Sequence, residues 1–146
     1  MIGGADPETL TIYVDYFLKD FIMRTQELIN NMYQQLGGKM FSSMTDAKIT
    51  FMEGKDLEGK PCDVALIIML PASPFNIHKI KIVEMCLMAN DTYTFKFIKK
   101  VGDKPFKTIS GVYCDQVQDI FELETNILVT PHNRTNSMVV VGENVI

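Results

Sequence analysis

The residue types best suited to nucleophilic or metal chemistry are few and widely separated in this sequence. Three cysteines (Cys62, Cys86 and Cys114) and two histidines (His78 and His132) occur with no Cys-x-x-Cys or His-x-x-x-His spacing. Such spacings bring metal ligands to one site, so the sequence predicts no metal centre, and it indicates no cofactor. Cys114 precedes an expected helix, where thiol pKa values fall, but an isolated free cysteine typically behaves as a small hydrophobic residue. We therefore assign no catalytic residue and expect a protein that is not an enzyme.

An eight-residue stretch from Gly54 to Pro61 comes close to a phosphate-binding loop. Gly59 and Lys60 match that motif, but Pro61 stands where a hydroxyl residue would hold Mg²⁺. Asp56 would place a negative charge inside the phosphate cradle, and the following residues favour a strand where the motif requires a helix. The stretch is therefore interpreted as a hairpin turn.

The central part of the sequence predicts a hairpin that carries the remaining chemical candidates. Its strands, 77–89 and 92–101, are joined by a two-residue turn at residues 90–91. This register places Glu84 on an aromatic face, diagonal to Lys99, where we expect an ion pair. One alternative function follows, a small enzyme or ligand carrier with a pocket between helix and sheet. The expected lining of that pocket is Tyr93, Phe95, Phe97, Glu84 and Cys86.

The opposite face of the same hairpin is expected to be basic. Four lysines near its open end would share this face: Lys79, Lys81, Lys96 and Lys100. Ammonium groups neutralise phosphates and other anions, so a second alternative is an anionic-ligand or nucleic-acid-binding protein. The net charge of −4 disfavours nucleic acid, and so does the expected position of the aromatic residues on the other face.

The elements that position these residues follow from capping and periodicity. Asp6 and Pro7 favour a helix start, and the glycines after Leu36 favour its end, so a long helix is expected over 7–36. Apolar alternation and turn residues then predict strands at 47–52, 62–70, 77–89, 92–101 and 106–109. A second helix begins at Asp115, with Gln118 as its capping-box partner. The fold class is therefore α+β, a long N-terminal helix packed on a four- to five-stranded antiparallel sheet, with a second C-terminal helix.

The first half of the long helix is apolar nearly all round, which requires burial on more than one side. The expected interaction residues are Leu10, Tyr13, Val14, Phe17, Phe21 and Leu28. One sheet covers only one face of a helix, so the leading prediction is a non-catalytic protein–protein interaction or assembly module that forms a homodimer or higher oligomer through this helix. A viral or phage accessory protein would fit this description.

Length and composition set the remaining expectations. The chain has 146 residues, 47% of them hydrophobic and 22% charged, as in an ordinary soluble globular protein. We expect one domain over 1–130 and a tail, loop or edge strand over 131–146. No apolar run is long enough to cross a membrane, and the N-terminus lacks the basic and apolar regions of a secretion signal. An odd number of cysteines suits a reducing compartment, so the expected location is the cytoplasm, or the host cytoplasm if the protein is viral.

Overall fold

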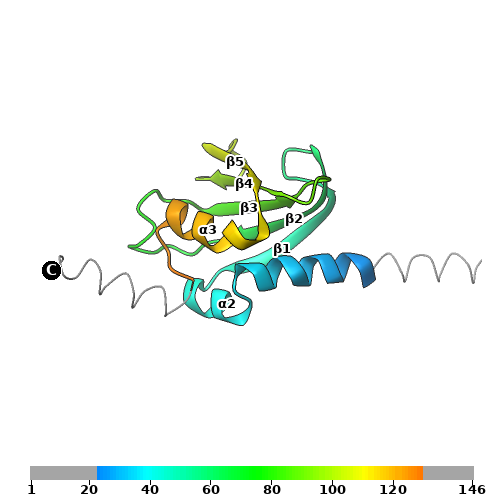
Figure 1. The fold of residues 1–146 in the computed structure, drawn as a ribbon. Coiled ribbons are helices and arrows are strands. Elements are labelled where there is room, and N and C mark those ends of the chain that lie inside the picture. Colours follow the sequence, from blue (N-terminus) through cyan, green and yellow to red (C-terminus); the bar gives the residue numbers. More distant parts are fainter. Residues whose placement is uncertain (1–22, 130–146) are drawn as a thin grey trace, which may run out of the picture.

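The computed structural model describes residues 23–129, which form an α+β fold (Figure 1). Residues 23–36 are helical and lead into a short second helix, the sheet and a final helix. These later elements are α2 (Lys39–Thr45), β1 (Lys48–Lys55), β2 (Pro61–Met69), β3 (Ile82–Leu87), β4 (Tyr93–Ile98), β5 (Lys107–Val112), the 3₁₀ turn η1 (Cys114–Gln116) and α3 (Val117–Thr125). The predicted fold class is confirmed.

The sheet is a five-stranded antiparallel meander in the order β1-β2-β3-β4-β5. The helices pack on one of its faces, because helix residues such as Met32, Phe41 and Phe121 share one apolar core with Val83 and Phe95 of the sheet. We call this face the helix-covered face. The rings of Phe41 and Phe121 meet edge to face with their centroids 5.0 Å apart, so the two shorter helices are joined directly within this core.

The first helix ends at Leu36, before two glycines, as the sequence predicts. Gly37 and Gly38 both have positive φ angles, and their N–H groups donate to the carbonyls of Gln34 and Tyr33. The predicted end of the helix after Leu36 is therefore confirmed. Residues 7–22 of the predicted helix, and the predicted tail at 131–146, lie outside the described residues.

The predicted register of the β3–β4 hairpin is wrong by one residue. Leu87 pairs with Tyr93, and the Met88 N–H donates to the Thr92 carbonyl, so the loop has three residues instead of two. Its last residue, Asp91, adopts a left-handed conformation with φ 64°, which is the usual form of a three-residue hairpin loop. Because side chains alternate between faces, this one-residue shift moves Lys96 of β4 to the same face as Glu84 of β3.

The limits of several other predicted elements also differ; β4, for example, ends at Ile98 and not at residue 101, and β5 continues to Val112 and not only to residue 109. The strand expected from residue 77 begins only at Ile82, because residues 70–81 form a loop. The second helix begins with η1, where Gln116 accepts a hydrogen bond from the Tyr113 N–H. Gln118 is therefore not the capping partner, and its side chain donates to the Gln35 carbonyl instead. Within residues 23–129, no helix has the length and apolarity needed to cross a bilayer.

Candidate functional site

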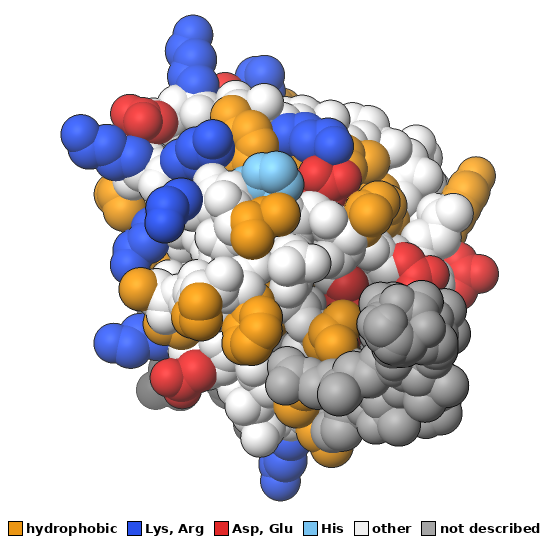
Figure 2. Space-filling model, turned by 90° about the vertical axis from the view of Figure 1, so that its left-hand side faces the viewer, with side chains coloured by type: hydrophobic (Ala, Val, Ile, Leu, Met, Phe, Trp, Pro, Cys, Tyr) orange, Lys and Arg blue, Asp and Glu red, His pale blue; other side chains and the backbone are white. Residues whose placement is uncertain are grey.

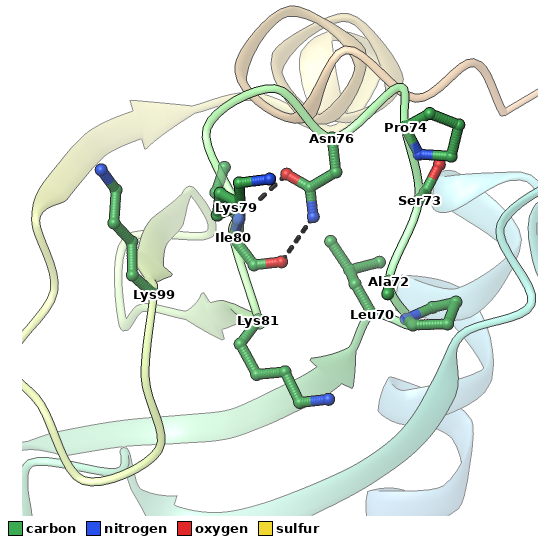
Figure 3. Close-up of a pocket in the computed structure, with 10 residues that line it drawn as sticks. Leu70, Ala72, Ser73, Pro74, Asn76, Lys79, Ile80, Lys81 and Lys99 are labelled. Atoms are coloured by element: carbon green, nitrogen blue, oxygen red, sulfur yellow. Dashed lines mark hydrogen bonds between the residues drawn. The ribbon is translucent and has the colours of Figure 1, made fainter.

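A pocket of about 500 Å³ lies beside the loop that connects β2 to β3 (Figure 3). Its walls combine aliphatic and proline side chains with three lysines. The lining residues are Leu70, Pro71, Ala72, Ser73, Pro74, Asn76, Lys79, Ile80, Lys81 and Lys99. We call this hollow the loop pocket. An apolar wall with a few charged groups is the usual composition of a ligand site.

One buried side chain fixes the shape of this loop. The Asn76 amide group donates to the Ile80 carbonyl over 2.6 Å, and its carbonyl oxygen accepts from the Ile80 N–H over 2.9 Å (Figure 3). The two ends of the loop are joined by a hydrogen bond, in which the Leu70 N–H donates to the Lys81 carbonyl. These bonds hold Lys79 in a left-handed conformation with φ 56°, which is uncommon for a residue with a long side chain. The loop pocket is therefore built before any ligand arrives.

Two of the three lysines of the loop pocket have no acidic partner among the described residues, and the third contacts an aromatic ring. Within residues 23–129, Lys79 and Lys81 form no ion pair, and Lys99 lies over the Phe106 ring with its Nζ 4.7 Å from the ring centroid. Figure 3 shows the side chains of Lys81 and Lys99 running in different directions, with their ammonium groups pointing away from each other. The charges are thus spread around the rim.

Two exposed hydrophobic side chains belong to the loop that forms the loop pocket. Phe75 and Ile77 are 55% and 63% exposed. The loop lies at the left of Figure 1, the side that faces the viewer in Figure 2. Figure 2 shows basic side chains gathered along one part of this face, with separate hydrophobic side chains between and below them. This face can therefore offer positive charge and apolar contact together.

The expected group of four lysines is not found as such. Lys79 and Lys81 do lie together at the loop pocket, and Lys100 is exposed just after β4. Lys96 departs from the prediction because the corrected register turns it to the other side, where only 5% of the residue is exposed. Lys99, which was expected on the aromatic face with Glu84, lines the loop pocket instead.

The residues expected to mediate self-association are mostly beyond the described part of the chain. Leu10, Tyr13, Val14, Phe17 and Phe21 all lie there. Leu28 is described, and it packs half-buried against the core of its own subunit. Self-association through the N-terminal helix therefore stays a prediction.

A second polar site lies on the face of the sheet opposite the helices, beneath the loop that joins β1 to β2. This loop was predicted as a hairpin turn, which is confirmed by the pairing of β1 with β2. Asp56 Oδ1 accepts hydrogen bonds of 2.9 Å from the N–H groups of both Glu58 and Lys60. Gly59, with φ 83°, closes the turn. The loop thus surrounds a carboxylate of its own chain, where the related motif would hold a phosphate.

Lys96 reaches from β4 into this second site. Its Nζ lies 2.6 Å from Asp56 Oδ2 and 2.8 Å from Glu58 Oε1. Burial alone would lower the pKa of Lys96, but its hydrogen bonds with the two carboxylates outweigh burial and raise that pKa. Burial alone would raise the pKa of Asp56, and the hydrogen bonds from Lys96 and the loop N–H groups lower it instead. Lys96 therefore stays cationic and is not activated as a nucleophile.

Glu84 and two cysteines complete the second site. Glu84 is fully buried, and its Oε2 accepts a 2.6 Å hydrogen bond from the Leu57 N–H. Burial raises the pKa of Glu84. Burial also raises the pKa of both Cys86 and Cys62, which pack together in a small apolar cluster on this face. Neither thiol has the lowered pKa of a catalytic cysteine. We call Asp56, Glu58, Glu84, Cys86 and Lys96 the buried charge cluster, in which Glu58 is the one exposed member.

The expected pocket between helix and sheet is divided by the corrected register. Tyr93, Phe95 and Phe97 lie in the core on the helix-covered face. Glu84 and Cys86 lie on the opposite face. These five residues therefore line no common pocket. Cys114 is exposed in η1.

Sequence reasoning missed Asn76 and the role of Asp56. Asn76 follows two prolines and lies just before the strand predicted from residue 77, so nothing in the pattern indicated that its side chain would be buried and hydrogen-bonded to Ile80. Asp56 was noticed only as an obstacle to phosphate binding. The signal that was available is Gly59. The Asp56 N–H donates to the Lys60 carbonyl, so residues 57–59 form a three-residue hairpin loop, and such a loop favours glycine at its third position.

Comparisons of the chain with protein-family models, curated proteins and solved structures found no significant match. The geometry of the two sites is therefore the basis for assigning a function.

Proposed function

We propose that this protein is a non-catalytic binding module whose loop pocket receives a protein partner that carries acidic side chains next to apolar ones. The observation that carries the proposal is the set of three rim lysines, Lys79, Lys81 and Lys99, around an apolar pocket. Two of them have no ion pair within the described part of the chain. A preformed loop keeps the conformational cost of binding low.

The spacing of the charges favours a polypeptide over a single small anion. One phosphate or carboxylate is best held by donors that point at one place, whereas Lys81 and Lys99 point away from each other (Figure 3). A peptide with several separated carboxylates can meet both lysines, and its apolar side chains can contact the exposed Phe75 and Ile77.

A protein partner also fits the charge of the whole chain better than nucleic acid does. The net charge is −4, which repels a polyanion outside this one basic region. A short acidic segment of a protein needs to approach only the loop pocket, so long-range repulsion weakens its binding less.

The test measures binding of a fluorescein-labelled peptide in which glutamate alternates with leucine, by fluorescence anisotropy with the full chain. We expect saturable binding that weakens as salt increases, because exposed charges are screened within about 8 Å at physiological salt. The double substitution Lys79→Glu and Lys81→Glu should raise the Kd at least about 10-fold, since it reverses two rim charges.

A matched control keeps the net charge of the double variant the same. Lys39 and Lys55 are exposed and do not line the loop pocket, so Lys39→Glu with Lys55→Glu should leave the Kd within about 2-fold. An equal loss in this control would contradict the proposal. So would tighter binding of a labelled oligothymidine, or equal binding of a peptide with glutamine in place of glutamate.

A further inference from the structure

Among residues 23–129, Glu84 Oε1 in the buried charge cluster has no hydrogen-bond partner. The atom is buried on β3, while the other oxygen of the same carboxylate accepts from the Leu57 N–H. A buried polar atom left unmatched costs about 1–3 kcal/mol, and more when the group is charged. Such an oxygen is satisfied by a cation or by a proton, and its neighbours distinguish the two.

The neighbours of Glu84 supply metal ligands at short range. One ligand atom each from Asp56, Glu84 and Cys86 lies within 4.8 Å of the other two, and all three residues are buried. In a tetrahedral site, with bonds of about 2.0 Å to oxygen and 2.3 Å to sulfur, ligand atoms are about 3.3–3.5 Å apart. The three groups therefore need to approach by no more than ~1.5 Å to share one ion.

We propose that Asp56, Glu84 and Cys86 form a binding site for a divalent transition metal ion of the Zn²⁺ class. A sulfur ligand disfavours Mg²⁺ and Ca²⁺, which prefer oxygen alone, and two carboxylates disfavour Cu⁺. Cys62 packs against the same small apolar cluster as Cys86, but it does not belong to the group of three ligands that lie within 4.8 Å of one another. The expectation of no metal site rested on sequence spacing, which says nothing about ligands gathered from β3 and a distant loop.

The charge balance allows a cation at this site. Asp56, Glu58 and Glu84 are three carboxyl groups near one ammonium group, that of Lys96. Lys96 already bonds to both Asp56 and Glu58, so it can keep Glu58 while Asp56 turns toward the metal. A pocket of about 390 Å³ lined by Leu57 and Glu58 lies beside the covering loop, although none of the three proposed ligands lines it.

The test titrates chelator-treated full-length protein with Co²⁺ and then displaces it with Zn²⁺. Cobalt bound by cysteine sulfur gives a thiolate-to-metal charge-transfer band in the near ultraviolet, so the readout reports the Cys86 ligand directly. We expect this band in the wild type, its loss on addition of Zn²⁺, and at least about 10-fold weaker Co²⁺ binding in Glu84→Gln and in Cys86→Ser. Glu84→Gln keeps the side-chain shape and guards against a Cys86→Ser variant that does not fold.

Cys114→Ser is the matched control, since Cys114 is an exposed cysteine outside the cluster. It should keep the band unchanged. Absence of the band at millimolar Co²⁺, its loss in Cys114→Ser, or undiminished binding in Glu84→Gln would each overturn the proposal. A different result would be a protein that binds no Co²⁺ and shows the infrared carbonyl stretch of a protonated carboxylic acid. If this stretch vanishes in Glu84→Gln, a proton and not a metal ion occupies the Glu84 carboxylate.

Discussion

The two faces of the sheet are both buried, but one carries apolar side chains and the other carries charged side chains. On the helix-covered face, Val83, Met85 and Phe95 are completely buried among apolar side chains. On the opposite face, Glu84 and Lys96 are buried to nearly the same degree in the same two strands. We call this the loop-covered face, because the loop that joins β1 to β2 reaches it through Asp56 and Leu57.

The difference lies in what each face requires of its neighbours. Apolar side chains on the helix-covered face need only close packing, which is non-directional. Each buried polar group on the loop-covered face needs a partner at a defined distance, and losing one partner leaves an unpaired charge. The helix-covered face should therefore lose stability in proportion to the volume removed, and the loop-covered face in proportion to the charges left unpaired.

The largest effect is expected from Phe95→Ala on the helix-covered face. Phe95 is fully buried, so the substitution removes a large apolar side chain and leaves a cavity. We expect the free energy of unfolding to fall by about 4 kcal/mol in urea denaturation. Ile98→Val removes one methylene group from the loop-covered face of the same strand and should cost only about 1 kcal/mol. Equal losses in the two variants would contradict the volume dependence.

The next largest effect is expected from Lys96→Met, which keeps most of the side-chain volume but removes the charge. Asp56 would remain buried without its ammonium partner. We expect the free energy of unfolding to fall by about 3 kcal/mol, as measured by urea denaturation. Lys107→Met removes an exposed partner of Glu124 and should cost less than about 1 kcal/mol.

A double variant sharpens this prediction. Adding Asp56→Asn to Lys96→Met removes the unpaired carboxylate charge of residue 56. The asparagine oxygen can still accept hydrogen bonds from the N–H groups of Glu58 and Lys60. The double variant should recover part of the lost stability, because neighbouring groups of one network are not additive. A further loss would mean that packing of the lysine stem, and not its charge, stabilises this face.

The contrast between the faces also explains how much of the fold was predictable. The helix end at Gly37 and Gly38, the α+β class and the antiparallel order follow from local turn chemistry and apolar periodicity. These signals are contained within short stretches of sequence. The residues of the helix-covered face were predicted only in part. The aromatic residues of β4 were correctly placed on one face, but they were paired with the wrong residues of β3.

The candidate sites were less predictable because both depend on single loop residues. One extra residue in the turn that ends at Asp91 moves Lys96 to the side of Glu84, and hydrophobic alternation does not count loop residues. The loop pocket depends on the hydrogen bonds between Asn76 and Ile80. These bonds hold the residues before Ile82 in a loop, so β3 begins later than the predicted strand. Asp56 joins the cluster only through the folding of its hairpin onto the sheet, a contact between segments about 40 residues apart that no local pattern encodes.

A gain in stability is expected from Glu84→Gln in chelator-treated protein. The glutamine oxygen can keep the hydrogen bond from the Leu57 N–H, and its amide group brings a donor beside Asp56 without any charge to bury. We expect the free energy of unfolding at neutral pH to rise by about 1 kcal/mol. A loss of stability would show that the Glu84 carboxylate is matched by a cation that the chelator does not remove.

The pH dependence of that gain gives the finest comparison of the two faces. Burial raises the pKa of Glu84 in the folded protein above its ordinary value of 4.5. The folded state then binds the proton more tightly than the unfolded state, so stability due to this group is greatest below the unfolded pKa and is lost as the pH rises through the folded pKa. Glutamine does not titrate, and the stability difference between Glu84→Gln and wild type should therefore increase as the pH rises from about 4 to 8. Phe95→Ala, on the helix-covered face, changes no titrating group, so its loss of stability should stay constant over the same pH range. If the stability difference between Glu84→Gln and wild type is also constant, burial has no effect on the pKa of this carboxylate.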